Sequence, residues 1–128
     1  MTRNFVVLLI VLTKNYYKMA VNHRFARRDL KHKEVANKFK ELGYSVLDLS
    51  YLENCCDFVA TNGSVVYFVE VKNGYNLLTE GEIKFIRNFK SQVYVLENAK
   101  QVEKLVVKGE YELSKRIERQ LIKDKINS

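Results

Sequence analysis

The chain switches between two hydrophobic periods, and these periods predict its first elements. From Leu30 to Leu42 apolar residues recur at helical spacing, and Gly43 follows as a stop signal. Tyr44–Leu49 alternates between apolar and polar residues with a period of two, which is typical of a short strand. We therefore predict a helix that is followed by a strand.

A hairpin is predicted next. The runs Cys56–Thr61 and Val65–Lys72 are rich in β-branched and aromatic residues, and they flank Asn62-Gly63. This dipeptide favours the positive φ angles of a tight turn, so it predicts that the two runs pair as antiparallel strands. Asn73-Gly74 ends the second strand.

Capping signals and a short alternating run predict the later elements. Thr79 with Glu82 forms a capping box, and Leu78 with Ile83 forms the matching hydrophobic staple. A helix is therefore predicted from Thr79 to about Lys90. A fourth strand is predicted over residues 92–97, with its apolar side chains alternating between the two faces.

Two helices are predicted in the last third of the chain. Asn98 with Gln101 is a second capping signal and opens the first of them. After Gly109 a charged amphipathic helix is predicted over residues 110–126, and its apolar residues at i, i+4 spacing are Leu113, Ile117 and Leu121. This last helix is expected to pack on the core, with a dimer contact as the alternative.

The order helix, strand, strand, strand, helix, strand predicts an α/β domain in which helices flank the sheet. The 128 residues are 47% hydrophobic and contain no linker, repeat or low-complexity run, which predicts a single domain with its core at about residues 30–106. The apolar run Phe5–Leu12 has eight residues, far fewer than the roughly 20 that span a bilayer. Residues 1–18 are interpreted as an extension, either a buried element or residues upstream of a start at Met19. A soluble, intracellular protein is expected.

The positive charge is concentrated in one sector. Residues 14–40 hold nine basic and two acidic residues, so the net charge of this sector, +7, equals that of the whole chain. A single basic sector on an otherwise neutral domain is the footprint of a phosphate-backbone partner, although a solvated helix face would carry the same charge. DNA is the expected partner, and no nucleotide cofactor or membrane contact is predicted.

Four side chains are nominal zinc ligands, but their spacing does not indicate a zinc site. Cys55 and Cys56 are neighbours, and no recognised metal-binding spacing relates them to His23 and His32. Two thiols are no secreted disulfide framework, so we predict that the cysteines are small buried residues.

The predicted hairpin gathers charged side chains at one spot. A turn centred on the Asn-Gly dipeptide places Asp57 opposite Phe68. Alternation along the second strand puts Phe68, Glu70 and Lys72 on that same face. Asp57 then lies diagonal to Glu70, at about 7–8 Å between the backbones. Two carboxylates and an amine are therefore predicted to converge.

This convergence suits phosphodiester chemistry. Two acids this close repel each other unless a cation lies between them, and oxygen ligands suit Mg²⁺ or Mn²⁺. Lys72 beside the metal can orient or help deprotonate a water and stabilise charge on a phosphoryl oxygen. The plainer interpretation is a surface salt bridge of Lys72 with Asp57 or Glu70, worth about 0–1 kcal/mol. An interior strand is predicted here, however, and charge in such a strand is costly unless it is used.

Asp57 followed by Glu70-Val71-Lys72, in this order of elements, resembles the PD-(D/E)XK nuclease superfamily, although Cys56 stands where a proline usually precedes the acid. The resemblance implies a restriction-endonuclease-like αβββαβ core with a mixed sheet. It also implies a deoxyribonuclease that depends on Mg²⁺ or Mn²⁺. Asp57 and Glu70 would be metal ligands, the Val71 carbonyl a third contact, and Lys72 the catalytic amine.

The stretch from Asp57 to Val106 is most similar to the small phage- and virus-type VRR-NUC nucleases. These carry a Glu-Val-Lys strand, a short Gly-containing loop and a Leu-Thr helix start, which corresponds here to Leu78-Thr79-Glu80-Gly81-Glu82. The family commonly has Gln at the last of these positions, so Glu82 is either a supporting site residue or only the capping partner of Thr79. A virus- or phage-encoded enzyme that acts in the host cytoplasm is implied.

The same superfamily often supplies one more acid from the first helix, and Glu34 is the candidate here. It lies at the edge of the apolar stripe that contains Val35, whereas the alternative is a surface pair with Lys38 at i+4. Basic side chains at and before this helix would contact phosphates without reading sequence, so DNA binding should be salt-sensitive. These side chains are Arg24, Arg27, Arg28, Lys31 and Lys33.

Three alternatives remain open. An archaeal-type Holliday junction resolvase resembles the chain in its Glu-bearing first helix, its Gly-aromatic step and its Glu-Val-Lys strand. Such an enzyme would act as a homodimer, with Phe5–Leu12 or the terminal helix as the interface. A nucleic-acid-binding module without catalysis would explain the basic sector but not the converging charges. A structural or viral accessory protein would have kept the fold and lost the chemistry.

Overall fold

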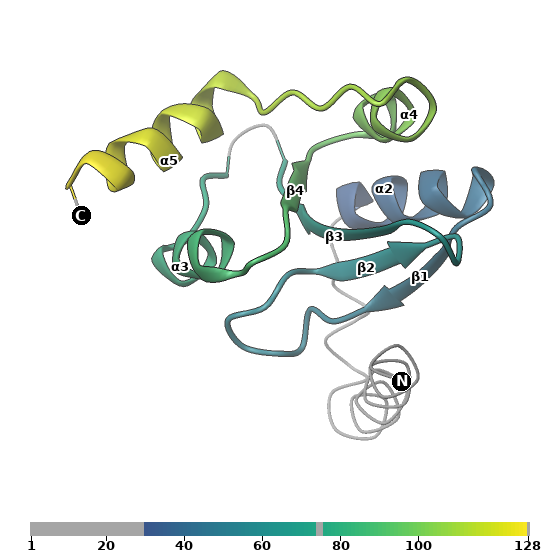
Figure 1. Ribbon diagram of the computed structural model, residues 1–128, viewed down its shortest axis with the longest axis horizontal. Helices are drawn as coiled ribbons and strands as arrows, with labels where there is room; N and C mark the ends of the chain where they lie inside the picture. Colours follow the sequence, from purple (N-terminus) through teal and green to yellow (C-terminus); the bar gives the residue numbers. More distant parts are fainter. Residues whose placement is uncertain (1–29, 74–75, 128) are drawn as a thin grey trace.

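The computed structural model describes residues 30–73 and 76–127, with side chains to residue 122. Its elements (Figure 1) run in the order α2 (Leu30–Glu41), β1 (Ser45–Asp48), β2 (Phe58–Thr61), β3 (Val66–Val71), α3 (Glu80–Asn88), β4 (Val93–Leu96), α4 (Ala99–Lys108) and α5 (Lys115–Asn127). The predicted order of elements and the α/β fold class are confirmed. No helix within the described ranges is long and apolar enough to cross a membrane.

The four strands form one mixed sheet in the order β1-β2-β3-β4. β1 and β2 pair antiparallel, as do β2 and β3, whereas β3 and β4 pair parallel. The parallel pair follows from the connection through α3, because two parallel neighbours need a crossover. β3, the strand that carries Glu70, therefore lies in the interior of the sheet, as predicted.

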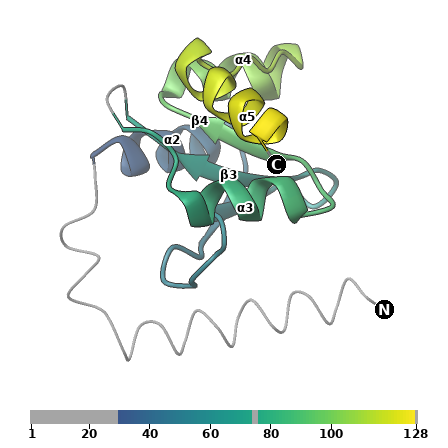
Figure 2. The ribbon, with the colours of Figure 1, turned by 90° about the vertical axis from the view of Figure 1, so that its left-hand side faces the viewer.

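Helices cover both faces of the sheet (Figures 1 and 2). On one face, Phe39 of α2 and Val102 of α4 belong to a core cluster that also contains Val69 of β3. On the other face, Ile83 of α3 and Ile117 of α5 belong to one cluster. Side chains alternate along β4 as predicted, so that one set faces α2 and α4 and the other set faces α3 and α5.

The register of the β2–β3 hairpin differs from the predicted one. Phe68 pairs with Val59, so the predicted pairing of Asp57 with Phe68 is wrong by two residues. An even shift keeps every side chain on its predicted face. Asp57 accordingly remains on the face of Glu70, and the carboxyl groups of these two residues are hydrogen-bonded.

The cause of the shift lies in the turn. The Asn62 side-chain oxygen accepts hydrogen bonds from the backbone N–H groups of Ser64 (2.9 Å) and Val65 (2.8 Å). The Thr61 hydroxyl also accepts a hydrogen bond from the backbone N–H of Gly63 (3.0 Å), whose φ angle is 96°. These side chains stabilise a turn one residue further along the chain than the dipeptide alone suggests.

Both predicted capping signals are confirmed. The Thr79 hydroxyl accepts a hydrogen bond from Glu82 N (3.2 Å), and the Glu82 carboxylate accepts one from Thr79 N (2.8 Å). The side chain of Asn98 accepts a hydrogen bond from Gln101 N (2.9 Å) at the start of α4. The start of α3, and with it the position of Glu82, is therefore determined by local chemistry.

The last predicted helix begins later than expected. α5 starts at Lys115, so Leu113 precedes the helix instead of lying on it. Gly109 ends α4 in the left-handed conformation, and the chain then continues without regular secondary structure to α5. There the hydroxyl of Tyr111 accepts a hydrogen bond from the backbone N–H of Val95 (2.8 Å) at the outer edge of the sheet. As expected, α5 packs on the core, through the buried side chain of Ile117.

Candidate active site

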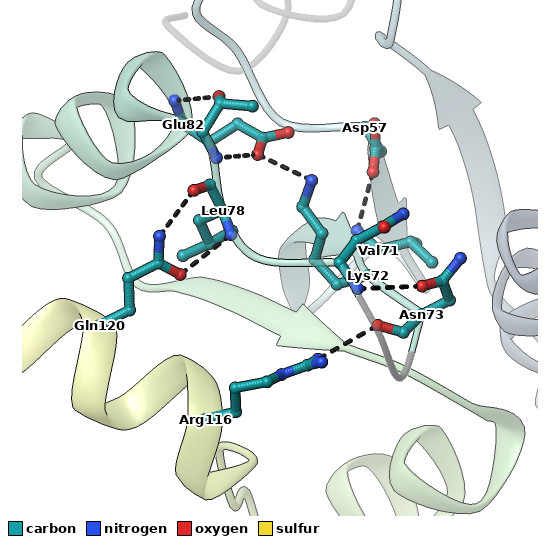
Figure 3. A network of polar contacts seen from close by, with 10 residues as sticks. Asp57, Val71, Lys72, Asn73, Leu78, Glu82, Arg116 and Gln120 are labelled. Carbon is teal, nitrogen blue, oxygen red and sulfur yellow. Dashed lines mark hydrogen bonds and ion pairs between the residues drawn. The ribbon is translucent and has the colours of Figure 1, made fainter.

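Three carboxyl groups meet beside the carboxyl end of β3. Asp57 precedes β2, Glu70 lies on β3, and Glu82 lies in the first turn of α3. The Glu70 carboxyl forms hydrogen bonds with those of both Asp57 and Glu82, and only 4% of the Glu70 residue is exposed. The Asp57 carboxylate also accepts a hydrogen bond from the backbone N–H of Val71 (2.8 Å; Figure 3).

The protonation of this cluster follows from its burial. Desolvation, the negative charge of Asp57 and the hydrogen bond with Glu82 raise the pKa of Glu70 far above its ordinary value. Burial would also raise the pKa of Glu82, but hydrogen bonds from Glu70, Lys72 and the Thr79 backbone together lower it. Glu70 therefore carries a proton at neutral pH and donates it in a hydrogen bond to a neighbouring carboxylate.

Lys72 joins this cluster through Glu82. The Lys72 Nζ and a carboxylate oxygen of Glu82 are 2.8 Å apart, and 12% and 23% of the two side chains are exposed (Figure 3). The backbone N–H of Lys72 donates to the carbonyl of Leu96 on β4 (3.1 Å), which holds the end of β3 in the sheet. Glu82 thus caps α3 and also contacts Glu70 and Lys72, and its role as a supporting site residue stays a prediction.

Glu34 forms hydrogen bonds with residues outside the carboxyl cluster. Its carboxylate accepts hydrogen bonds from the backbone N–H of Ala99 (2.8 Å) and from Lys31 Nζ (3.3 Å). The Ala99 N–H is the main reason that the pKa of Glu34 is lowered. The described contacts thus tie α2 to the first turn of α4 instead of bringing Glu34 to Glu70. The alternative partner Lys38 pairs with Glu41 and Glu103.

The predicted phosphate contacts are placed only in part. Lys31 and Lys33 lie in the first turn of α2, and Lys33 is exposed. Arg24, Arg27 and Arg28 lie outside the described residues, as does the apolar segment Phe5–Leu12.

The two cysteines lie directly before Asp57. Cys56 is buried, with its Sγ 3.6 Å from the carbonyl oxygen of Phe58, whereas Cys55 is half-buried. The hydrogen bond from the Cys56 thiol lowers the pKa of Cys55 to about 7. Both thiols are free. Their predicted role as small buried residues thus holds for Cys56 and only in part for Cys55.

The fit of a divalent cation can be judged from these carboxyl groups. No set of three or more His, Cys, Asp or Glu side chains in the described part of the chain surrounds one point as a complete ligand set. Asp57 and Glu70 nevertheless lie so close together that the negative charge of Asp57 raises the pKa of Glu70. Oxygen pairs of this kind suit Mg²⁺ or Mn²⁺, which are commonly held by one or two carboxylates and waters, and ligand protons are released on binding. The donors therefore fit such an ion.

The C-terminal helix holds the segment that links Lys72 to α3 (Figure 3). Gln120 on α5 accepts a hydrogen bond from Leu78 N (2.9 Å) and donates one to Leu78 O (2.6 Å). Arg116, one turn earlier, donates to the Asn73 carbonyl (3.2 Å) and to the Glu97 carboxylate (3.1 Å). Both ends of this segment, and with them Lys72 and Glu82, are thus anchored by one helix.

Sequence reasoning did not find these two residues. A signal was present, because Arg116 and Gln120 are polar residues at i, i+4 spacing beside the apolar stripe of Ile117 and Leu121. Polar side chains on the border of a buried stripe can reach backbone groups of a neighbouring segment.

Replacing Gln120 with alanine should lower the free energy of unfolding by about 1–3 kcal/mol, because two backbone groups of Leu78 lose their partner. Urea denaturation at neutral pH measures this difference. The control Arg119→Ala removes an exposed side chain from the same helix and should change stability by less than about 0.5 kcal/mol. Equal losses in the two variants would contradict the anchoring role of Gln120.

Comparison of the chain with known protein-family models, with curated proteins and with solved structures gives no match. The resemblance carried by Asp57, Glu70-Val71-Lys72 and Leu78-Thr79 therefore stays a prediction from the sequence. Function has to be argued from the side chains that meet at the end of β3, since a fold alone does not determine activity.

Proposed function

We propose that this protein is a Mg²⁺- or Mn²⁺-dependent DNA endonuclease that hydrolyses phosphodiester bonds. The observation that carries the proposal is the contact of the half-buried Asp57 with Glu70, which is buried on an interior strand, with Lys72 two residues beyond Glu70. Burying Glu70 against a second acid is unfavourable in a purely structural role, since Glu70 must then stay protonated. In a metal site a divalent cation would replace this proton, and this would explain why the two acids lie together.

The geometry disfavours the plainer salt-bridge interpretation. Lys72 pairs with Glu82, whereas Asp57 accepts a hydrogen bond from the Val71 N–H and lies beside the protonated Glu70. A surface ion pair would need neither burial nor a third acid. The element order of the described chain also agrees with the αβββαβ core that the family resemblance implies.

Asp57 and Glu70 would hold the metal ion, with the Val71 carbonyl as a further ligand. When bound, such an ion polarises the phosphodiester and makes the attacking water more acidic. Lys72 would stabilise negative charge on the phosphoryl oxygens and orient the attacking water. Glu82 would hold the Lys72 amine in place, and the Thr79 cap fixes Glu82 in turn.

DNA is proposed as the substrate because of the basic sector at residues 14–40, and its recognition would follow shape more than sequence. Action inside the cytoplasm is also proposed, and the free thiols of Cys55 and Cys56 agree with a reducing compartment. A four-way junction as the preferred substrate, cut by a homodimer, would identify the resolvase alternative.

The proposal is tested with labelled duplex, nicked, flap and four-way-junction DNA, each incubated with Mg²⁺, Mn²⁺ or EDTA. The wild type should cut at least one substrate when a metal is present and none in EDTA. Asp57→Asn keeps the shape of the side chain but removes the ligand charge, so it should abolish cleavage. Glu118→Gln also removes one negative charge, but from an exposed side chain on α5, so this variant should cut like the wild type. Binding of DNA without cleavage under any of these conditions would overturn the proposal in favour of a binding module.

A further inference from the structure

A second feature adjoins the carboxyl cluster on the α3 side of the sheet. A cavity of about 590 Å³ lies between α3 and the segment that connects β1 to β2, and these two parts of the chain are neighbours in Figures 1 and 2. Its volume falls in the range of small-molecule sites, roughly 300–1,000 Å³. Asn54 lines it three residues before Asp57, and Gly81 lines it next to Glu82. The cavity therefore borders the proposed active site through both segments.

Two unfavourable local features place one amide at this cavity. Asn54 has a φ of 58°, and within the described residues it is the one non-glycine residue with a positive φ. Gly81 sits in the first turn of α3, where glycine is less favourable than alanine by about 1 kcal/mol. A Cβ at Gly81 would lie 3.1 Å from the Asn54 side-chain oxygen, so the glycine leaves room for this amide. Non-glycine residues in the left-handed region, such as Asn54, are frequent at functional sites.

Aromatic rings form part of the wall. Phe85 and Phe89 both line the cavity, and their rings stack with centroids 4.9 Å apart and an interplanar angle of 27°. The rings of Phe68 and Phe89 pack edge to face, and their centroids are 4.8 Å apart. Phe89 is 36% exposed. The rings are therefore held in position and one of them stays accessible.

The remaining lining residues are polar. Asn88 and Lys84 are exposed on α3, and the Lys84 amine lies 3.9 Å from the Glu80 carboxylate, which also lines the cavity. The charges of Lys84 and Glu80 offset each other, so a strongly anionic ligand is not favoured as the sole occupant. Rings, two amides and one amine suit a flat heterocycle that has hydrogen-bonding edges and a phosphate nearby.

We propose that this cavity binds an unpaired nucleotide of the DNA strand next to the cleaved bond. The base would stack on Phe89 and be contacted at its edge by Asn54 and Asn88, and Lys84 would contact the adjoining phosphate. A paired base cannot bind in this way, because its faces are covered by its neighbours in the duplex. The inference rests on the proposed function and narrows its substrate to DNA with a single-stranded nucleotide, as at a flap or a gap.

Binding in EDTA tests this inference without cleavage. Fluorescence anisotropy gives the dissociation constants of a labelled duplex and of the same duplex with a single-stranded flap, for the wild type and Phe89→Ala. Phe89→Ala should weaken flap binding by about 5- to 100-fold and leave duplex binding within about twofold. Phe89→Leu keeps apolar packing against Phe68 and Phe85 but lacks the ring, so it should behave like Phe89→Ala while retaining the thermal stability of the wild type. Val107→Ala removes an exposed apolar side chain from α4 and should change neither constant.

The charged rim is tested in the same assay. Lys84→Ala should weaken flap binding more than Lys100→Ala, an equal loss of charge on α4. Equal binding of flap and duplex by all variants, or equal effects of Phe89→Leu and Val107→Ala, would overturn the inference. If the protein cleaves DNA and the Phe89 variants bind the flap normally, the proposed base site is wrong but the proposed nuclease activity is supported. If the Phe89 variants lose flap binding but the wild type never cleaves DNA, the base site is supported and the proposed nuclease activity is contradicted.

Discussion

Replacing Lys72 with alanine should lower the single-turnover rate of DNA cleavage by about 100- to 10,000-fold while leaving the fold and DNA affinity nearly unchanged. Lys72 follows Glu70 by two residues, and its ion pair with Glu82, which also contacts Glu70, determines where its charge lies. Rates are measured with excess enzyme, affinity by anisotropy in EDTA, and the fold by circular dichroism.

A matched control and a conservative variant make this result specific. Lys38 is also a partly buried lysine in ion pairs, but it lies on α2 and pairs with Glu41 and Glu103, so Lys38→Ala should cut at the wild-type rate. Lys72→Arg keeps the positive charge but cannot give up a proton at neutral pH. Recovery of the rate in Lys72→Arg would assign charge stabilisation to Lys72, and no recovery would assign proton transfer. A rate for Lys72→Ala within fivefold of the wild type would contradict the role of this residue.

Replacing Glu70 with glutamine should make the metal-free protein more stable at pH 7, by about 1–3 kcal/mol. In the folded chain Glu70 holds a proton at neutral pH, because burial and the neighbouring acids raise its pKa above the ordinary value of 4.5 that it has when unfolded. The unfolded chain has lost that proton at pH 7. The contribution of Glu70 to stability is therefore most favourable below pH 4.5 and declines as the pH rises from 4.5 toward the folded pKa. Glutamine has no proton to lose and avoids this decline.

Urea denaturation of the wild type and Glu70→Gln in EDTA at pH 4, 5.5 and 7 measures the effect. The two proteins should be about equally stable at pH 4, and the variant should gain steadily as the pH rises. Added Mn²⁺ should stabilise the wild type by mass action and leave the variant unaffected. A stability difference that does not change with pH would contradict the raised pKa of Glu70, and Glu118→Gln controls for the loss of an exposed charge.

Local signals predicted most of the fold. The capping residues Thr79 and Asn98 determined two helix starts because their hydrogen bonds involve only neighbouring residues. Alternation along β3 placed Glu70 and Lys72 on one face, since that alternation does not depend on which strand pairs with it. The register failed where side chains of the turn, above all Asn62, outweighed the preference of the Asn-Gly dipeptide.

Long-range contacts could not be predicted in the same way. Gln120 contacts Leu78, which is 42 residues away, and only the packing of α5 determines this contact. Glu34 lies on the edge of a helical stripe, from which it could turn toward the sheet or away from it. The direction of the Glu34 side chain is determined by its hydrogen bond with the Ala99 N–H at the N-terminus of α4. No local sequence pattern around Glu34 reveals this donor.

Tyr111 also affects how two copies of this chain could join. An open sheet edge invites a strand from a second molecule, which would hydrogen-bond to the free N–H and C=O groups. On β4 the N–H of Val95 is already occupied by the Tyr111 hydroxyl, and the Tyr111 ring packs against that of Tyr94. These contacts disfavour the pairing of a further strand with β4, so a symmetric pair of active sites is expected to form through another surface of the molecule.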